Sequence, residues 1–162
     1  MKKYELTTNT KMLFGRKLFQ IKALVSFGGV TAGDLGGYIE KEENLSHDGT
    51  AWVYGDALVY GNARVSGDAW VSGDAWVSGD AWVYGNADYI CFKGFGSKNR
   101  NTTMFRTKNG DVYVCCGCFT GSLKKFTEKV KETHGNGKCA KEYLACVEAA
   151  KIHFEIGEEN DK

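Results

Sequence analysis

Residues 51–88 read AWVYGD ALVYGN ARVSGD AWVSGD AWVSGD AWVYGN AD, which is six hexads in series without an insertion. Alanine holds the first position of every hexad and valine the third, and glycine followed by aspartate or asparagine closes each unit. In an extended chain, alternation puts Ala and Val on one face and the residue between them on the other. The closing pair suits a sharp corner, because these residues tolerate the backbone angles that it needs. A strand of three residues is not stable alone, so the hexads predict stacked coils with Ala and Val in a shared interior.

The tract resembles the hexapeptide repeat of left-handed parallel β-helices, the fold of the hexapeptide acyltransferases. The resemblance covers residues 45–88, with LSHDGT at 45–50 as a looser unit. In that family three hexads form one triangular coil, which implies about two full coils here and stacking of residues eighteen apart. Related β-helix proteins often form trimers, so the resemblance also implies a homo-oligomer, a trimer or a dimer.

The segments on either side of the hexads have a different texture. Residues 1–44 alternate over 11–27 and are expected to form a β-rich N-terminal cap, with a hairpin turn at Gly15-Arg16. A parallel stack leaves unpaired backbone groups at its ends, so a cap is required.

Residues 89–155 are expected to form a small α+β domain, and 156–162 an acidic tail. Asn109-Gly110 predicts a type I′ hairpin turn, and Ser122 predicts the N-cap of a helix that runs through Thr133. The remaining expected elements are strands over 89–93, 104–107 and 111–116 and a second helix over 138–153. The predicted fold class is therefore mainly β with an α+β C-terminal part: a short left-handed parallel β-helix between a β-rich cap and a small domain.

Composition limits the class of protein. The 162 residues carry 21 Lys and Arg against 20 Asp and Glu, so neither an acidic DNA mimic nor a uniformly basic nucleic-acid coat fits. No apolar run follows the basic start, and no stretch approaches 18 apolar residues, so neither a signal peptide nor a membrane span is expected. All six cysteines lie beyond residue 90 without an export signal, which favours reduced thiols and a cytoplasmic location.

The middle position of each hexad is expected to face outward. The large apolar residues there predict an interface: Trp52, Leu58, Trp70, Trp76 and Trp82. Stacking at eighteen residues would place Trp52 over Trp70, Leu58 over Trp76, and Arg64 over Trp82. The alternative is that the flanking segments fold back and cover these side chains.

The stretch FKGFGSKNRNTTMFRTK, residues 92–108, carries five cations and no acid. Small polar residues and glycines between the cations offer hydroxyls and backbone amides, the groups that hold phosphate. The candidate ligands of a nucleotide, a nucleic acid or another anion are Lys93, Ser97, Lys98, Asn99, Arg100, Asn101, Thr102 and Arg106. A solvated surface loop is the alternative, and no Walker or dinucleotide fingerprint supports a narrower ligand.

The case for catalysis is weaker. The hexapeptide acyltransferases use a catalytic His, loops extruded from the coils and coenzyme A; here the coils carry no extruded loop and only His47 lies near them. Three scattered His do not supply a hydratase-type metal site, and no C-x₂-C pair is present. Cys115, Cys116 and Cys118 would pack as buried thiols, bind a metal ion or, with His134 as a base, act as nucleophiles. We expect no catalytic or metal-ligating residue and no cofactor, with an acetyl coenzyme A-dependent transferase as the alternative.

Two longer segments, Tyr4 to Ala57 and Gly94 to Tyr143, resemble short hexapeptide-repeat proteins of phages and prophages of Gram-positive bacteria, most of which are called hypothetical or polymer-forming. The resemblance implies a phage accessory protein that acts on a host system, such as inhibition of an antiviral defence. The prediction is a non-catalytic binding protein whose oligomeric β-helix displays a small domain to a host protein or to a phosphate-bearing ligand.

Overall fold

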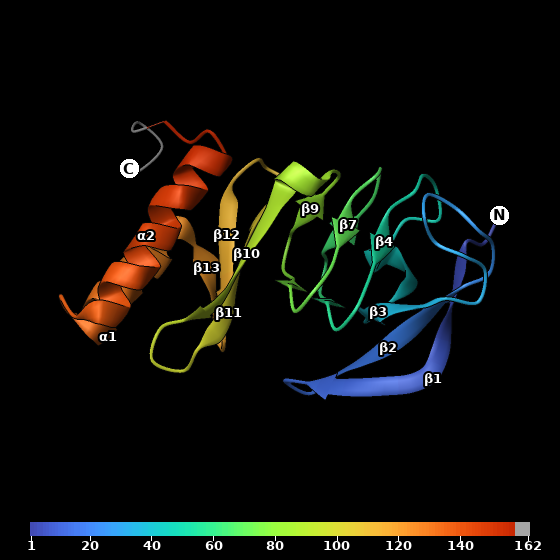
Figure 1. The fold of residues 1–162 in the computed structure, drawn as a ribbon, viewed down its shortest axis with the longest axis horizontal. Helices are drawn as coiled ribbons and strands as arrows, with labels where there is room; N and C mark the ends of the chain where they lie inside the picture. Colours follow the sequence, from blue (N-terminus) through green and yellow to red (C-terminus); the bar gives the residue numbers. More distant parts are fainter. Residues whose placement is uncertain (158–162) are drawn as a thin grey trace. The chain divides into compact units, whose positions relative to one another are not determined.

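The computed structural model describes residues 1–157 and divides the chain into two compact units, Met1–Asn86 and Ala87–Lys162. The chain is mainly β with a C-terminal helical part, as expected (Figure 1). The predicted N-terminal cap and the hexads fall within one unit, and the boundary comes at 86/87 rather than after 88. Most of the predicted acidic tail, 158–162, lies outside the described residues.

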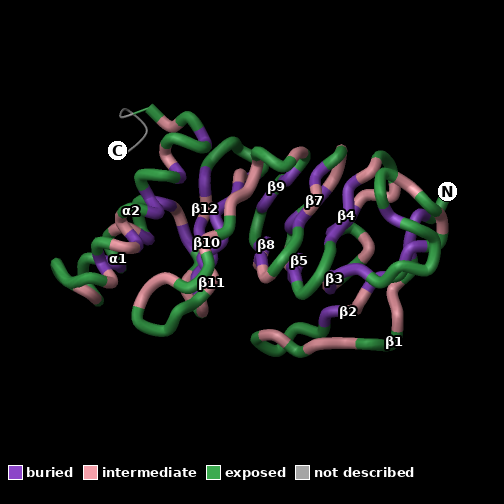
Figure 2. The backbone as a smooth tube through the Cα atoms, viewed as in Figure 1, coloured by how far each residue is buried: buried purple, intermediate pink, exposed green. Residues whose placement is uncertain are grey.

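The hexads form a solenoid of short parallel rungs. The rungs are β4 (Trp52–Val53), β5 (Leu58–Val59), β6 (Arg64–Val65), β7 (Trp70–Val71), β8 (Trp76–Val77) and β9 (Trp82–Val83). They pair in parallel at a spacing of eighteen residues, as Trp52↔Trp70, Leu58↔Trp76 and Arg64↔Trp82. The Ala and Val of all six hexads are at most 1% exposed, which confirms the predicted interior (Figure 2).

The glycines at the corners have the backbone conformation that the sequence predicted. Five of them, at 55, 61, 67, 73 and 79, have φ between 63° and 68°, a region that favours glycine. In the first hexad corner the Ala57 N–H bonds the Tyr54 carbonyl at 3.4 Å, closing a turn of four residues. The hexad pattern therefore specifies the corners as well as the rungs.

The N-terminal segment extends the solenoid by one partial coil. Its elements are β1 (Tyr4–Leu13), β2 (Arg16–Ala23), β3 (Leu35–Ile39) and the 3₁₀ turn η1 (Glu42–Asn44). β3 pairs in parallel with β5, and the antiparallel β1–β2 hairpin continues the same sheet in the order β1-β2-β3-β5-β8. The hairpin turn is Phe14-Gly15, with φ of 49° and 77°, one residue earlier than predicted.

Side chains of this segment replace a missing coil. Within the repeats, the carbonyls of Ala69, Ala75 and Ala81 each accept a backbone N–H from the coil before. Of the three matching Ala carbonyls in the first coil, the one that receives a backbone N–H is that of Ala57, from Tyr38 at 3.0 Å. The Ala51 carbonyl accepts the Lys3 Nζ at 2.8 Å, and the Ala63 carbonyl accepts the Asn44 Nδ2 at 2.9 Å. We call this arrangement of Lys3, Tyr38 and Asn44 the coil cap.

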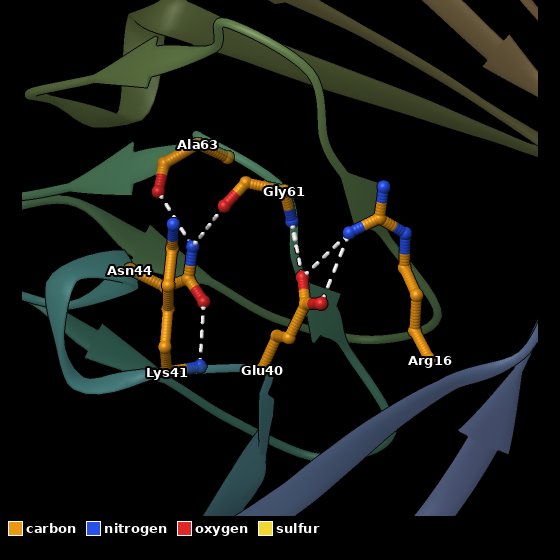
Figure 3. Close-up of polar contacts among 6 residues, drawn as sticks. All are labelled: Arg16, Glu40, Lys41, Asn44, Gly61 and Ala63. Carbon is orange, nitrogen blue, oxygen red and sulfur yellow. Dashed lines mark hydrogen bonds and ion pairs between the residues drawn. The ribbon is translucent and has the colours of Figure 1, made fainter.

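Asn44 and Glu40 complete the cap at the corner around Gly61 (Figure 3). The second proton of the Asn44 amide bonds the Gly61 carbonyl at 3.1 Å, and its Oδ1 accepts the Lys41 N–H at 2.9 Å. Glu40 accepts the Gly61 N–H at 2.7 Å and pairs with Arg16 at 2.9 Å. Every polar atom of the Asn44 side chain is therefore bonded to backbone.

The N-terminal segment also covers the outer surface of the solenoid. Leu18 of the hairpin packs with Tyr38, Leu58 and Tyr60 in a buried cluster, to which Leu13 and Trp76 add. β3 approaches the coils so closely that a Cβ on Gly36 would come within 2.7 Å of the Trp52 ring. These contacts bury part of the hexad surface that was predicted to form an interface.

The C-terminal unit is a four-stranded antiparallel sheet with two helices. Its elements are β10 (Tyr89–Phe95), β11 (Arg100–Arg106), β12 (Val112–Cys116), β13 (Phe119–Ser122), α1 (Leu123–His134) and α2 (Lys138–His153), preceded by the 3₁₀ turn η2 (Asn86–Asp88). Strand order follows chain order, and the helices pack against Met104, Val114 and Cys116 of the sheet.

Two local predictions in this unit have different outcomes. Ser122 caps α1 as predicted, because its Oγ accepts the Lys125 N–H at 3.2 Å. The type I′ turn at Asn109-Gly110 is wrong, since only Gly110 has a positive φ, at 84°. The bond from the Thr107 N–H to the Asp111 carbonyl, at 2.9 Å, instead closes a three-residue connection.

Candidate functional site

The cationic stretch forms a β-hairpin rather than the open loop that its polarity predicted. β10 and β11 pair from Tyr89↔Phe105 to Phe95↔Arg100, so only residues 96–99 form the turn. Gly96 has φ of 78° and Asn99 has φ of 49°, a conformation that glycine and asparagine adopt at low cost. The strand expected over 89–93 lies within β10, whereas β11 begins four residues before the strand expected over 104–107. That earlier start was missed because residues 100–103 are Arg, Asn and Thr and carry no apolar alternation.

Two of the predicted anion ligands, Thr102 and Arg106, bond to other groups of the C-terminal unit. Thr102 is fully buried, and its hydroxyl donates to the Cys116 Sγ at 3.3 Å. The Arg106 guanidinium donates to the Phe154 carbonyl at 2.8 Å and lies 3.6 Å from the Asp88 carboxylate. Thr102 is therefore inaccessible to an anion from solvent, and its assignment as a ligand is wrong. Arg106 is engaged within the C-terminal unit, and its role as an anion ligand stays a prediction.

The other predicted ligands lie at or near the turn. Four consecutive exposed residues form what we call the hairpin tip: Ser97, Lys98, Asn99 and Arg100. Lys93 is exposed on β10 and Asn101 is half-buried on β11. Within residues 1–157, neither Lys98 nor Arg100 forms a salt bridge.

The base of the tip is fixed by close contacts with α2 and with the β12–β13 turn. The Gly96 N–H donates to the Glu142 Oε2 at 2.8 Å, and a Cβ at Gly96 would overlap the Tyr143 hydroxyl. A Cβ at Gly117 would overlap the Arg100 guanidinium, which therefore lies against that backbone. The tip is thus a cationic turn whose base is anchored, and Glu142 places one carboxylate beneath it.

Cys116 and Tyr143 form a buried polar contact below the tip. The Cys116 Sγ lies 3.8 Å from the Tyr143 hydroxyl, which also lies 3.4 Å from the Phe95 carbonyl. Burial is the main cause that raises the pKa of Tyr143 far above its ordinary value, so this phenol stays protonated. The predicted base His134 stacks near the Tyr143 ring, with centroids 5.8 Å apart. The contacts of Cys116, Tyr143 and His134 are therefore typical of core packing rather than of a nucleophile with its base.

The other cysteines give the same picture. Cys115 is buried and Cys118 exposed, and none of the six cysteines forms a disulfide in the structure. Burial raises the pKa of Cys146 to about 11, which keeps that thiol neutral at physiological pH. In the described part of the chain, no three His, Cys, Asp or Glu side chains gather in a way that would hold a metal ion.

The predicted aromatic interface is only partly on the surface. Trp52 and Leu58 are 1% and 6% exposed, so the expectation that they face solvent is wrong. Phe27 and Tyr4 cover Trp52 with ring centroids at 5.4 and 6.4 Å. The covering segments are distant in sequence, and the hexad pattern alone contains no signal of them.

The second coil keeps more of its aromatic surface. Trp70 and Trp76 are half-buried, and Phe14 at the hairpin turn contacts Trp76 with centroids 6.0 Å apart. Trp82 remains 45% exposed, and Tyr84 beside it is 70% exposed. Tyr84 occupies the fourth position of its hexad, whereas the predicted interface used only the second position.

His47, the residue on which an acyltransferase would depend, belongs to the N-terminal end of the solenoid. Its Nδ1 accepts the Lys3 N–H at 3.1 Å, and its ring stacks on Tyr4 with centroids 4.2 Å apart. The lone pair that a general base would use is therefore already bonded to backbone.

Comparison with known proteins supports the architecture and gives no function. The family model described as YdcK beta solenoid repeat matches residues 51–67 and 59–73. No curated protein matches the chain. Among the described residues, no helix is both long and apolar enough to cross a membrane. The matched residues lie within the first four hexads, so the central tract of this chain is a β-solenoid repeat.

Proposed function

We propose that this protein is a non-catalytic binding protein that captures a phosphate-bearing ligand at the hairpin tip. The observation that carries the proposal is the pair of exposed cations, Lys98 and Arg100, on a turn held in place by Gly96 and Gly117. A guanidinium binds phosphate oxygens in pairs, and an ammonium adds a point charge. Ser97 and Asn99 supply a hydroxyl and an amide at the same tip.

The anchored base of the tip favours binding. Residues that are already held in place lose less conformational entropy when a ligand binds. The ligand class is a nucleotide, a nucleic acid or another phosphate-bearing anion. Affinity for a polynucleotide would fall steeply with salt, because released counterions supply much of the binding free energy, whereas a mononucleotide would depend on salt less.

The test is native mass spectrometry of protein purified gently from a bacterial host. Any ligand found in this way is then titrated into the ligand-free protein to measure its affinity. The double variant Lys98→Glu and Arg100→Glu reverses the charge of the tip, and we expect it to bind at least tenfold more weakly, from loss of charge-assisted bonds worth about 1.5–3 kcal/mol each. Lys124→Glu with Lys125→Glu is the matched control, because both lysines are exposed on α1. Equal affinity of the two double variants would refute a site at the tip.

A protein partner is the second candidate, and the exposure of Trp82 and Tyr84 favours it. Trp and Tyr are the residues most often found at the energetic centre of protein interfaces. A homo-oligomer, trimer or dimer, would use the same surface and display several tips at once, which raises avidity. Trp82→Ala should then reduce the native mass to that of one chain.

The finer features of the proposal rest on the resemblances described above. We propose a left-handed winding of the solenoid, because the hexads are similar to those of left-handed β-helices. A phage accessory role in the host cytoplasm, with a defence system as target, is supported by the similarity of the Tyr4 to Ala57 and Gly94 to Tyr143 segments to phage proteins. The acetyl coenzyme A-dependent alternative loses support from the bonded Nδ1 of His47.

A further inference from the structure

His47 joins the first residues of the chain to the first coil. It lies in the loop between η1 and β4, and its Nδ1 accepts the Lys3 backbone N–H at 3.1 Å. The imidazole stacks on the Tyr4 ring, with planes 18° apart. The residues that it touches are those that close the solenoid, since Lys3 caps Ala51 through its ammonium group.

The hydrogen bond fixes the tautomer of this histidine. An Nδ1 that accepts a bond carries no proton, so the proton of the neutral ring is on Nε2. That Nε2 is buried without a hydrogen-bond partner, and the nearest carboxylate oxygen, the Glu42 Oε2, is 4.0 Å away. A second proton can therefore enter only at Nδ1, where it would face the Lys3 N–H.

The surrounding charges oppose that second proton on balance. Burial is the largest cause that lowers the pKa of His47, and Lys2, Lys3 and the amino group of Met1 lower it further. Glu42 is the one group that acts in the opposite direction, and it is itself paired with Lys2 at 2.8 Å. Tyr4, on the other side of the ring, is neutral because burial and nearby acids raise its pKa.

We propose that His47 is an acid-released latch on the N-terminal segment: its protonation breaks the bond to Lys3, frees residues 1–4 and uncovers Trp52. Two donors then face each other where one bond stood, which weakens the hold on Tyr4, whose hydroxyl still bonds the Glu42 and Leu45 carbonyls. Tyr4 bonds the Leu45 carbonyl at 2.7 Å and lies edge-on against Trp52, so its release opens both the edge of the coil and the aromatic ring. The inference is independent of the hairpin tip.

Hydrogen exchange at several pH values tests the latch. After correction for the intrinsic effect of pH, protection of residues 1–13 should fall about tenfold between about pH 7.5 and pH 5, the expected loss for one hydrogen bond to a buried group. His47→Asn keeps an acceptor near the position of Nδ1 but cannot titrate, so in this variant the protection of residues 1–13 should stay constant over the same pH range. His153→Asn, an exposed histidine of the other unit, should behave as the parent protein does.

Spectra of the imidazole nitrogens in the parent protein provide a measurement that does not depend on a variant. They should show the Nε2–H tautomer at neutral pH and a titration midpoint below 6.5, the ordinary value for histidine. An Nδ1–H tautomer at neutral pH, or the same loss of protection in His47→Asn as in the parent, would overturn the proposal.

Discussion

Replacing Asn44 by alanine tests whether side chains close the solenoid. Asn44 is fully buried and makes three bonds to backbone, to the Lys41 N–H and to the Gly61 and Ala63 carbonyls. Alanine would leave one buried donor and two carbonyls without those partners. A buried hydrogen bond contributes about 1 kcal/mol net, so three give about 3 kcal/mol. For a unit of this size that corresponds to a drop of roughly 15 °C in Tm.

The chain offers a clean readout of that loss. All four tryptophans lie in the unit Met1–Asn86, so their fluorescence during urea unfolding reports on this unit alone. The control is Asn62→Ala, an exposed asparagine in a hexad corner, which should change the free energy of unfolding by no more than about 0.5 kcal/mol. Asn44→Asp should be at least as harmful as alanine at neutral pH, since its carboxylate would face two carbonyls. A loss below about 1 kcal/mol for Asn44→Ala would refute the capping role.

Two further predictions concern the same end of the molecule. Gly36→Ala should lower the free energy of unfolding by about 2 kcal/mol or more, because the new Cβ would meet the Val53 carbonyl oxygen. Gly85→Ala is the control and should change it little, since its Cβ would make only a contact at 3.5 Å. Equal melting temperatures for the two variants would contradict the close approach of β3. Burial lowers the pKa of Lys3 to about 8, so between pH 8 and about 9.5 the unfolded chain binds more protons than the folded one. Over that range the free energy of unfolding of the parent should therefore rise with pH relative to that of Lys3→Met. Parallel pH profiles for those two proteins would show that the ammonium group is not buried in the cap.

The solenoid could be predicted from the sequence because one local rule repeats. Each hexad states its own inward Ala and Val and its own Gly corner, and the rungs then pair wherever the spacing of eighteen returns. Helix α1 was equally accessible, since Ser122 and the apolar spacing behind it are local signals. Such features need no knowledge of distant parts of the chain.

The candidate site and the covered aromatics depend on contacts between distant segments. Nothing local marks Arg106 as the partner of the Phe154 carbonyl, 48 residues away, or Tyr4 as a cover for Trp52. Asn44 likewise lacks a signal, because its partners follow it by 17 and 19 residues. The Gly36-Gly37 pair within a strand was the one clue to a close backbone approach that the sequence did contain.

The near-identity of the hexads has a consequence for how such a chain can change length. The hexads at 69–74 and 75–80 are identical, AWVSGD, so one could be gained or lost without changing the repeat pattern. Gain or loss of one hexad would leave the interior intact, since every hexad supplies the same Ala and Val. The polypeptide would nevertheless leave the solenoid from a different one of its three faces, because a full circuit takes eighteen residues. Lineages should therefore tolerate length variation in steps of three hexads and select against steps of one or two.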